Sequence, residues 1–251
     1  MRSSIMHTAM GKLGTATGWA FAAALALSAP SAPALAQDYA AVLAAPDRTD
    51  ADRANDKKRD AQKLLEFTAP KTGWRVLDMG AGGGYSTELI ARAVGPTGKV
   101  YGQNDKESDR FAARMKATAV KNIASTPRPF DDPAADDVKG LDLITFYFYY
   151  HDTTYMNVDR AKMNKAMYDA LKPGGFLVIA DHSAKKGEGV TVGKTTHRIE
   201  ESTLVAEVQN AGFQLIATGD FLRNPYDPRT ESVHKSGIRN DEFVVKFQKP
   251  Q

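Results

Sequence analysis

The chain of 251 residues has no cysteine, no strong excess of either charge and no apolar run long enough to cross a bilayer. The lack of thiols excludes a disulfide framework, a thiolate metal site and a lipid-anchored N-terminus. Lys and Arg number 33 against 30 Asp and Glu, a balance that gives no reason to predict binding to nucleic acid. The remaining composition, 42% hydrophobic and 25% charged, is ordinary for a globular domain with a core.

Residues 1–36 differ in composition from the rest. They carry Arg2, Lys12 and no acidic residue, then an apolar run from Trp19 to Leu27, then Ala34-Leu35-Ala36. This is the basic region, apolar region and A-x-A cleavage site of a secretory signal peptide. An uncleaved amphipathic or disordered leader is the alternative. We expect a signal peptide, a periplasmic or secreted protein of nearly neutral charge, and no stable membrane anchor after cleavage.

Strand-like and helix-like segments alternate along the rest of the chain. Residues 37–46 are Ala-rich and predict a loose linker, and Asp47–Phe67 has the apolar spacing of a helix, which Asp50 would cap; together they make an N-terminal linker and helix over residues 37–69. Strands are predicted at Arg75–Met79, Val100–Gln103, Ile123–Thr126, Leu141–Phe148, Phe176–Ala180, Phe213–Ala217 and Phe243–Phe247, and helices at Thr87–Val94, Ser108–Val120, Asn157–Leu171 and Ser202–Ala211. Such alternation predicts an α/β domain over residues 70–251, with a mostly parallel sheet covered by helices on both faces.

The most informative stretch is the glycine-rich turn after the first predicted strand. It reads Val76-Leu77-Asp78-Met79-Gly80-Ala81-Gly82-Gly83-Gly84-Tyr85 and leads into a predicted helix. A strand, a tight loop and a helix bring backbone N–H groups against a nucleotide-like ligand, although such a turn can also merely join a strand to a helix. The dinucleotide fingerprint G-x-G-x-x-G needs glycine where Tyr85 or Thr87 stands, and no P-loop lysine follows. A nicotinamide-dependent oxidoreductase is therefore not expected.

The spacing hydrophobic-hydrophobic-acid-hydrophobic-Gly-x-Gly-x-Gly resembles that of class I S-adenosylmethionine-dependent methyltransferases. The resemblance implies a Rossmann-like, seven-stranded, mostly parallel sheet whose last strand is antiparallel and inserted beside the sixth. It also implies S-adenosylmethionine as the cofactor, with Gly80, Gly82 and Gly84 passing under its amino-acid end and ribose. Asp78 would help to position the methionine part.

Two further cofactor contacts are implied by the same resemblance. After the second strand, the family's ribose-binding acid is replaced by Asn104, whose amide still offers an acceptor and donors. Asp105 is the alternative group at that position. After the third strand, Asp131 would face the adenine amino group, although Asp-Asp-Pro is also an ordinary turn.

The chemistry is predicted at the carboxyl ends of the fourth and fifth strands. The segment from Leu141 to Asp152 resembles the fourth-strand motif of small-molecule methyltransferases, in which this end lies beside the methyl group and its acceptor. His151 is the candidate general base, because the pKa of an imidazole suits proton removal near neutral pH. Tyr150 and His182 are the candidate residues beside the acceptor. A purely structural His151 is the alternative.

A metal site is weighed at the same edge and is not predicted. Asp152, Asp181 and His182 resemble only loosely the acids with which catechol-type methyltransferases bind a divalent ion. With His197, they are expected to form a carboxylate–imidazole cluster that positions the substrate or moves protons.

The sequence therefore predicts methyl transfer from S-adenosylmethionine to an unidentified small-molecule acceptor in the cell envelope. The alternative is a non-catalytic protein that binds S-adenosylmethionine or another nucleoside-type ligand on the same fold, because the ribose acid is replaced and the cofactor is made in the cytoplasm. The chain also resembles a group of predicted bacterial methyltransferases with signal peptides, through Gly80–Tyr85, Asp181–Ser183 and Gly219–Pro225.

Overall fold

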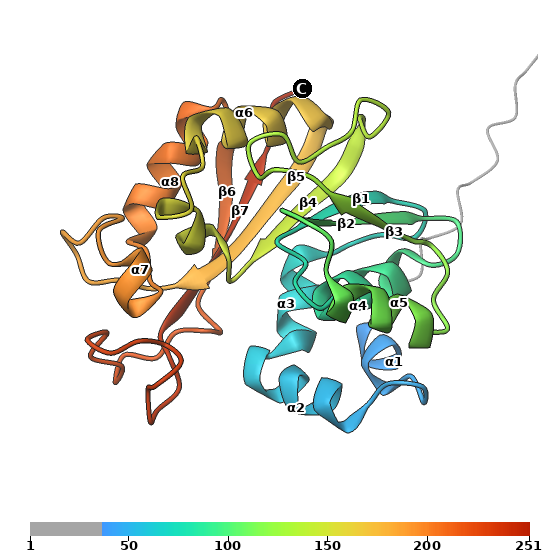
Figure 1. The fold of residues 1–251 in the computed structure, drawn as a ribbon, viewed down its shortest axis with the longest axis horizontal. Coiled ribbons are helices and arrows are strands. Elements are labelled where there is room, and N and C mark those ends of the chain that lie inside the picture. The colour runs from blue at the N-terminus through green and yellow to red at the C-terminus, as the bar shows by residue number, and fades with distance from the viewer. Residues whose placement is uncertain (1–36) are drawn as a thin grey trace, which may run out of the picture. The chain divides into compact units, whose positions relative to one another are not determined.

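A computed structural model describes residues 37–251, and the predicted signal peptide at 1–36 lies outside this range. Seven strands form one sheet in the order β3-β2-β1-β4-β5-β7-β6 (Figure 1). Strands β1 to β5 pair in parallel, and β7 runs antiparallel to its neighbours β5 and β6. This confirms the predicted fold, including the antiparallel last strand beside the sixth. The strands are β1 (Arg75–Met79), β2 (Lys99–Asn104), β3 (Ile123–Pro127), β4 (Leu141–Tyr147), β5 (Leu171–His182), β6 (Gln214–Gly219) and β7 (Glu242–Gln248).

Strand β5 begins earlier than the sequence predicts. Leu171 already pairs with Leu141, and the register then shifts before Leu143 pairs with Phe176. The Lys-Pro-Gly-Gly segment therefore forms an irregular start to the strand, where proline ends the preceding helix and Gly174 adopts a φ of 76°.

The helices cover the two faces of the sheet. They are α1 (Tyr39–Ala44), α2 (Asp50–Arg59), α3 (Ala61–Thr68), α4 (Tyr85–Val94), α5 (Asp109–Ala117), α6 (Arg160–Ala170), α7 (Gly193–Thr196) and α8 (Glu201–Asn210), with a 3₁₀ turn, η1, at Tyr150–Thr154. No helix among the described residues is long and apolar enough to cross a membrane.

The N-terminal part differs from the prediction in two ways. Residues 39–44 form a short helix rather than a loose linker. The predicted single helix is broken at Asp60, whose left-handed backbone (φ 45°, ψ 53°) ends α2 and begins α3. Thr49, not Asp50, caps α2, and it shares a capping box with Asp52.

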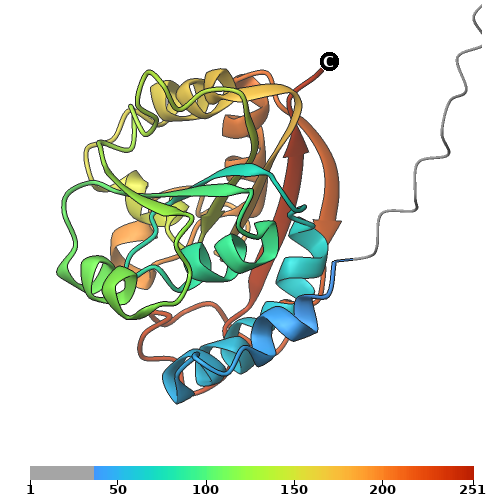
Figure 2. The same ribbon diagram turned by 90° about the vertical axis from the view of Figure 1, so that its right-hand side faces the viewer.

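Two hydrophobic layers hold the helices against the sheet. On one face, Met163 and Met167 of α6 and Leu204 and Val208 of α8 pack against β1, β4, β5 and β7. On the other face, the apolar side of α4 and Leu64 of α3 pack against β1, β2, β4 and β5 (Figures 1 and 2). The strand β4 is buried on both sides, so its carboxyl end is held rigidly.

An ion-pair network fastens the N-terminal helices to α4 and α5. Arg114 binds Asp52 and Glu88, each at 2.7 Å, and Arg92 binds Glu88 at 2.6 Å and Asp47 at 2.7 Å. Most of these side chains are shielded from solvent, which strengthens such pairs relative to exposed ones. The network holds α2 beside the glycine-rich turn, because Arg114 also donates to the carbonyl oxygen of Gly83 at 3.0 Å.

Candidate functional site

The glycine-rich turn lies at the carboxyl ends of β1 and β2, as the sequence predicts. The backbone N–H of Gly80 donates to Oε1 of Gln103 at 3.0 Å, and that of Gly82 donates to Oδ1 of Asn104 at 2.8 Å. Gly84 lies at the N-terminus of α4 with a φ of 81°. The turn is therefore tied to β2 by two amide side chains, of which Asn104 is the predicted ribose ligand.

A side chain is excluded at the three predicted cofactor glycines for different reasons. A Cβ on Gly80 would lie 2.9 Å from the Tyr149 side chain, and one on Gly84 would lie 3.1 Å from Phe111. A Cβ on Gly82 would meet no atom closer than 3.9 Å. Gly80 and Gly84 are thus required by packing within the protein, whereas Gly82 leaves open space above the turn. This open space fits a ligand that approaches the backbone closely.

Asp78 is fully enclosed by hydroxyl groups of the protein. It accepts hydrogen bonds from Thr87 and Thr145, both at 2.6 Å, and from Ser86 at 3.1 Å. Burial raises the pKa of Asp78, and the three hydroxyl groups oppose that shift. These contacts join β1, β4 and α4 beneath the turn, while a contact with the cofactor's methionine part stays a prediction.

The predicted adenine contact after β3 is only partly sheltered. Asp131 forms an ion pair with Nζ of Lys162 at 3.1 Å, and 29% of its side chain is exposed. The preceding residue, Phe130, stacks on Tyr149 with ring centres 5.2 Å apart. Asp105, the alternative to Asn104, is exposed.

The carboxyl ends of β4 and β5 bring a histidine and an aspartate into contact in the core. Both oxygens of the fully buried Asp181 accept hydrogen bonds, from the backbone N–H groups of His151 and His182 at 2.8 Å. Nδ1 of His151 lies 2.6 Å from the same carboxylate. Asp181 therefore sets the orientation of the His151 ring and directs its Nε2 towards Asp152, 3.2 Å away.

The surroundings of His151 argue against the predicted role as a general base. Burial lowers the pKa of His151, but the charges of Asp181 and Asp152 outweigh this effect and raise the pKa to about 10. Nδ1 of His151 faces Asp181 and its Nε2 faces Asp152, so neither ring nitrogen is free to take a proton from an acceptor.

Tyr150 is not placed beside the acceptor, which corrects the prediction. Its side chain is fully buried, and its hydroxyl group donates to Glu207 at 2.8 Å and accepts from Asn164 at 2.8 Å. The strand turns inward here, because Phe148 has a φ of 57° and η1 follows. Tyr150 therefore packs between the sheet and the helices α6 and α8.

His182 does line a hollow at this edge. Its ring lies 5.2 Å from that of Phe148, and its Nδ1 is 2.9 Å from Oε1 of Glu242, although out of line for a hydrogen bond. The hollow, of about 140 Å³, lies between the end of α2 and the long loop 220–241. A second hollow of about 480 Å³ continues it outward, and together we call them the trough. The trough is lined by Lys57, Lys58, Arg59, Phe148, His151, Asp152, His182, Val233, His234, Ser236, Ile238, Arg239, Asn240 and Glu242.

Three basic side chains of α2, Lys57, Lys58 and Arg59, line the trough. The Arg59 guanidinium lies 4.6 Å from the centre of the Phe148 ring and 5.8 Å from that of Tyr85. Neither Arg59 nor Lys58 has a hydrogen-bond or ion-pair partner within residues 37–251. Burial lowers the pKa of Arg59, which still remains charged at any ordinary pH. Two cations without ion-pair partners thus face the hollow from a helix that the ion-pair network holds in place, and Asp152 and Glu242 line the same hollow.

The comparison with protein families decides the class of this chain. Residues 57–208 match the family described as protein-L-isoaspartate(D-aspartate) O-methyltransferase, and the match spans more than half of the chain. The chain belongs to this family. It is therefore a class I S-adenosylmethionine-dependent methyltransferase, as its glycine turn and strand order indicate, and S-adenosylmethionine is the cofactor.

Individual relatives agree with this class. Protein-L-isoaspartate O-methyltransferase 1 of Arabidopsis thaliana is 35% identical over 112 residues, 43% of this chain and 46% of that protein. Trans-aconitate 2-methyltransferase of Variovorax paradoxus is 32% identical over 127 residues, 50% of this chain and 45% of that protein. The chain thus spans about half the length of the curated relatives it matches. A methyltransferase structure from Aquifex aeolicus shares the fold at a TM-score of 0.58 and 18% identity, covering 76% of this chain and 89% of that one.

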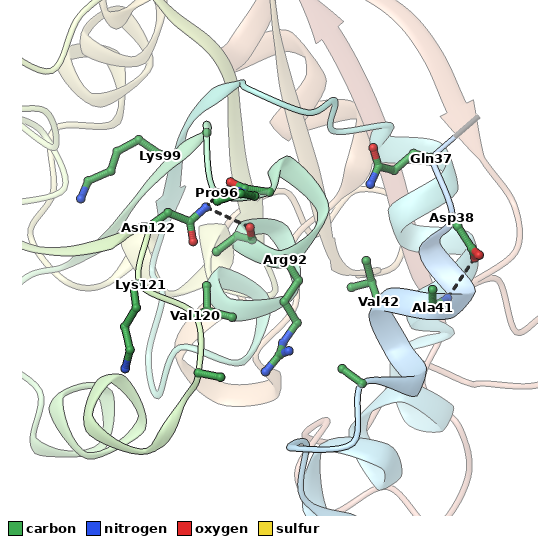
Figure 3. A pocket seen from close by; sticks show the side chains of 15 residues that line it. Gln37, Asp38, Ala41, Val42, Arg92, Pro96, Lys99, Val120, Lys121 and Asn122 are labelled. Atoms are coloured by element: carbon green, nitrogen blue, oxygen red, sulfur yellow. Dashed lines mark hydrogen bonds between the residues drawn. The ribbon is translucent and has the colours of Figure 1, made fainter. Parts of the chain in front are cut away.

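A separate hollow of the methyltransferase lies where β2 and β3 begin, at the opposite edge of the sheet from the trough (Figure 3). It measures about 950 Å³ and is bounded by α1, the end of α4 and the segments that lead into β2 and β3. Asn122 there donates to the carbonyl oxygens of Ala91 and Gly95, at 3.0 and 2.7 Å. Neither the glycine turn nor a histidine borders this hollow, so it is separate from the site at the carboxyl ends.

Several site residues of the methyltransferase escaped the sequence analysis. Gln103 ends a predicted strand, and Glu242 directly precedes another. Phe148 is the last residue of the predicted strand Leu141–Phe148, whose pattern gives no sign that this ring lines the trough. His234 lies in a long segment without secondary structure, where no periodicity fixes the direction of a side chain. The chain has only five histidines. The four that lie in the described part of the chain all meet at this site.

Proposed function

We propose that this methyltransferase transfers the methyl group of S-adenosylmethionine to a carboxylate oxygen of a small acceptor that enters the trough. The observation that carries the proposal is the pair of cations without ion-pair partners, Arg59 and Lys58, at a site where both ring nitrogens of the buried His151 face carboxylates. A carboxylate is attracted by such cations, and it is already a nucleophile at neutral pH. It therefore needs no proton removed before it reacts.

The residues present suit this chemistry. Gly82 leaves space for the cofactor above the turn, and Asn104 offers an amide beside it. The bound cofactor supplies an electrophilic methyl group. The acceptor oxygen forms the new C–O bond as the C–S bond breaks, so the products are a methyl ester and S-adenosylhomocysteine, and no proton moves. The task of the protein is alignment and the exclusion of water, which α2 and the loop 220–241 provide by flanking the trough.

The names of the family and of one relative support a carboxylate acceptor. The family is described by O-methyl transfer to isoaspartate, and the relative from Variovorax paradoxus is named for trans-aconitate. Both names refer to carboxylic acids. The inner hollow of about 140 Å³ suits a compact acceptor.

The test is methyl transfer with labelled cofactor to two sets of acceptors, small di- and tricarboxylic acids and an isoaspartyl peptide. We expect a base-labile methyl ester on a small acid, together with S-adenosylhomocysteine. Label in a base-stable product would refute the carboxylate assignment. A failure to bind S-adenosylhomocysteine at millimolar concentration in isothermal titration calorimetry would refute methyl transfer altogether.

A second candidate function is non-catalytic binding of the cofactor or of a related nucleoside. It is favoured by Asn104, whose carbonyl group already accepts the Gly82 N–H and lacks the charge that would hold ribose hydroxyl groups. A pure binding protein would bind S-adenosylmethionine and release no S-adenosylhomocysteine with any acceptor fraction from the cell envelope.

We propose in addition that the protein works in the cell envelope. The support is the sequence of residues 1–36, with two basic residues, an apolar run and an A-x-A site. N-terminal sequencing of the protein recovered from a periplasmic fraction should begin at or near Gln37. An intact N-terminus in the cytoplasmic fraction would contradict this proposal.

A further inference from the structure

Four histidines from separate segments meet at the carboxyl ends of β4 and β5. The ring centres of His151 and His182 are 5.5 Å apart, those of His151 and His197 are 5.6 Å apart, and those of His197 and His234 are 4.7 Å apart. Asp152 lies among them, and one ligand atom each from His151, Asp152 and His197 lie within 4.8 Å of one another.

Asp152 is the centre of this group. Its Oδ1 lies 3.2 Å from Nε2 of His151 and 3.2 Å from Nδ1 of His197, and it also accepts a hydrogen bond from the hydroxyl group of Tyr155. A carboxylate oxygen only accepts hydrogen bonds, so each nitrogen that faces it must carry a proton or share a cation with it.

In the orientation of His151, Nε2 is the ring nitrogen that faces Asp152 and must carry a proton or share a cation with it. Asp181 accepts from the His151 ring at Nδ1, which fixes the proton on that nitrogen. Neutral His151 would then turn an Nε2 lone pair towards the Asp152 carboxylate, an unfavourable arrangement. A carboxylate that holds Nδ1 while Nε2 faces a cation is the arrangement by which proteins orient histidine ligands to metal ions.

Two of the three separations between the ligand atoms suit a metal ion, and the third is below 4.8 Å. Imidazole nitrogen and carboxylate oxygen bind transition metals at about 2.0–2.2 Å, so adjacent ligands of a tetrahedral or octahedral site lie roughly 3.0–3.5 Å apart. The two 3.2 Å separations fall within this range.

The backbone supplies an independent observation. His197 has a left-handed conformation (φ 56°, ψ 50°), which is unfavourable for a residue with a Cβ and is retained where the surrounding structure requires it. His197 directly follows α7, and its Nδ1 lies 3.2 Å from Oδ1 of Asp152.

We propose that His151, Asp152 and His197 bind one divalent transition-metal ion, with Asp181 as the residue that positions His151. Two imidazoles and one carboxylate favour zinc, iron, cobalt or nickel over magnesium or calcium, which prefer all-oxygen ligands. Three protein ligands leave coordination positions open, and His151 and Asp152 both line the inner hollow of the trough, from which an exchangeable ligand has access. The site reverses the expectation from sequence that no metal is bound, and it does not depend on the proposed methyl transfer.

The test is a titration of the chelator-treated full-length protein with Co²⁺, followed by visible d–d absorption, and with Zn²⁺ in competition with a chromophoric chelator. We expect one equivalent of either ion and no displacement by excess Mg²⁺. Replacement of a ligand in His197→Ala or Asp152→Asn should weaken binding by more than about 100-fold, beyond the about 10–100-fold loss expected for the positioning variant Asp181→Asn.

One variant of the same site serves as a matched control. His182→Ala removes a neighbouring imidazole that is not one of the three proposed ligands, and it should bind Co²⁺ as the unchanged protein does. Asp152→Asn preserves shape, so it keeps the comparison valid if His197→Ala does not fold, as judged by thermal unfolding.

Three results would overturn the proposal. They are no binding of Co²⁺ or Zn²⁺ by the unchanged protein at micromolar concentration, full binding by both Asp152→Asn and a folded His197→Ala, or a loss in His182→Ala as large as that in His197→Ala. Binding of S-adenosylhomocysteine is measured on the same samples, so a failure of the proposed function is recorded separately from a failure of the metal site.

Discussion

Substitution of Gly82 tests whether the open space above the glycine turn receives the cofactor. Gly82 has a φ of 56°, and a Cβ there would meet nothing closer than 3.9 Å. The substitution Gly82→Ala therefore adds only backbone strain to the free protein, about 1–2 kcal/mol for an L-residue in this conformation. For a domain of this size, that loss lowers Tm by about 2–4 °C for each kcal/mol.

The effect on cofactor binding should be larger than strain alone explains. A methyl group inserted against a closely packed ligand costs typically 1–3 kcal/mol, which corresponds to roughly a 5- to 150-fold loss of affinity. Gly82→Val should be more severe, because a β-branched side chain is both bulkier and less compatible with a positive φ. Isothermal titration with S-adenosylhomocysteine, together with calorimetric unfolding, measures both effects.

Gly140 provides the matched control. Its φ is 67° and a Cβ there would meet no atom within 4 Å, so Gly140→Ala carries the same kind of strain away from the turn. We expect a similar fall in Tm and no change in affinity for S-adenosylhomocysteine. Equal affinities for the Gly82→Ala and Gly140→Ala proteins would refute the placement of the cofactor over Gly82.

Three further predictions follow from the same contacts. Arg59→Met keeps the apolar stem and removes the charge over Phe148. The KM for an anionic acceptor should therefore rise about tenfold, while the Kd of S-adenosylhomocysteine stays unchanged. A change in that Kd alone would assign Arg59 to the cofactor instead. Burial raises the pKa of Asp52, but the hydrogen bonds from Arg114 and the cap residue outweigh it and lower the pKa to about 2, below the unfolded value of about 3.9. Asp52 therefore stabilises the fold above about pH 4 and loses this contribution as the pH falls towards 2, so urea unfolding of Asp52→Asn should show a weaker dependence on pH in that window than the unchanged protein. Tyr150→Phe should lower the free energy of unfolding by about 1–2 kcal/mol, because the buried Asn164 and the partly buried Glu207 each lose a hydrogen bond, while kcat stays unchanged. A fall in kcat without a loss of stability would restore the catalytic role.

The fold was predictable because each strand and helix carries its own periodicity. The alternation of apolar strands with amphipathic helices was sufficient to predict the parallel sheet, and the family resemblance supplied the antiparallel last strand. The helix α1 was missed because six Ala-rich residues are too short to show a helical period. The break at Asp60 was missed because a left-handed residue in a polar helix leaves no apolar interruption in the sequence.

The glycine turn shows where local and tertiary information separate. Residues adjacent in sequence form the turn, so its conformation and the class of its ligand follow from the spacing of the glycines. Which glycine faces the ligand depends on Tyr149 and Phe111, two side chains from distant elements that cover Gly80 and Gly84. No pattern within the turn itself distinguishes Gly82 from its neighbours.

The sequence by itself determined the strand–turn–helix unit, the class of cofactor and the type of fold, because these depend on backbone conformations that neighbouring residues impose. Only the tertiary structure decided the chemistry of the histidines. Whether His151 carries a proton, accepts one or binds an ion depends on its distances to Asp152, Asp181 and His197, which come from separate segments of the chain. Electrostatic interactions act through space and strengthen in a buried site, so the role of that residue was set by the way β4, β5 and α7 converge.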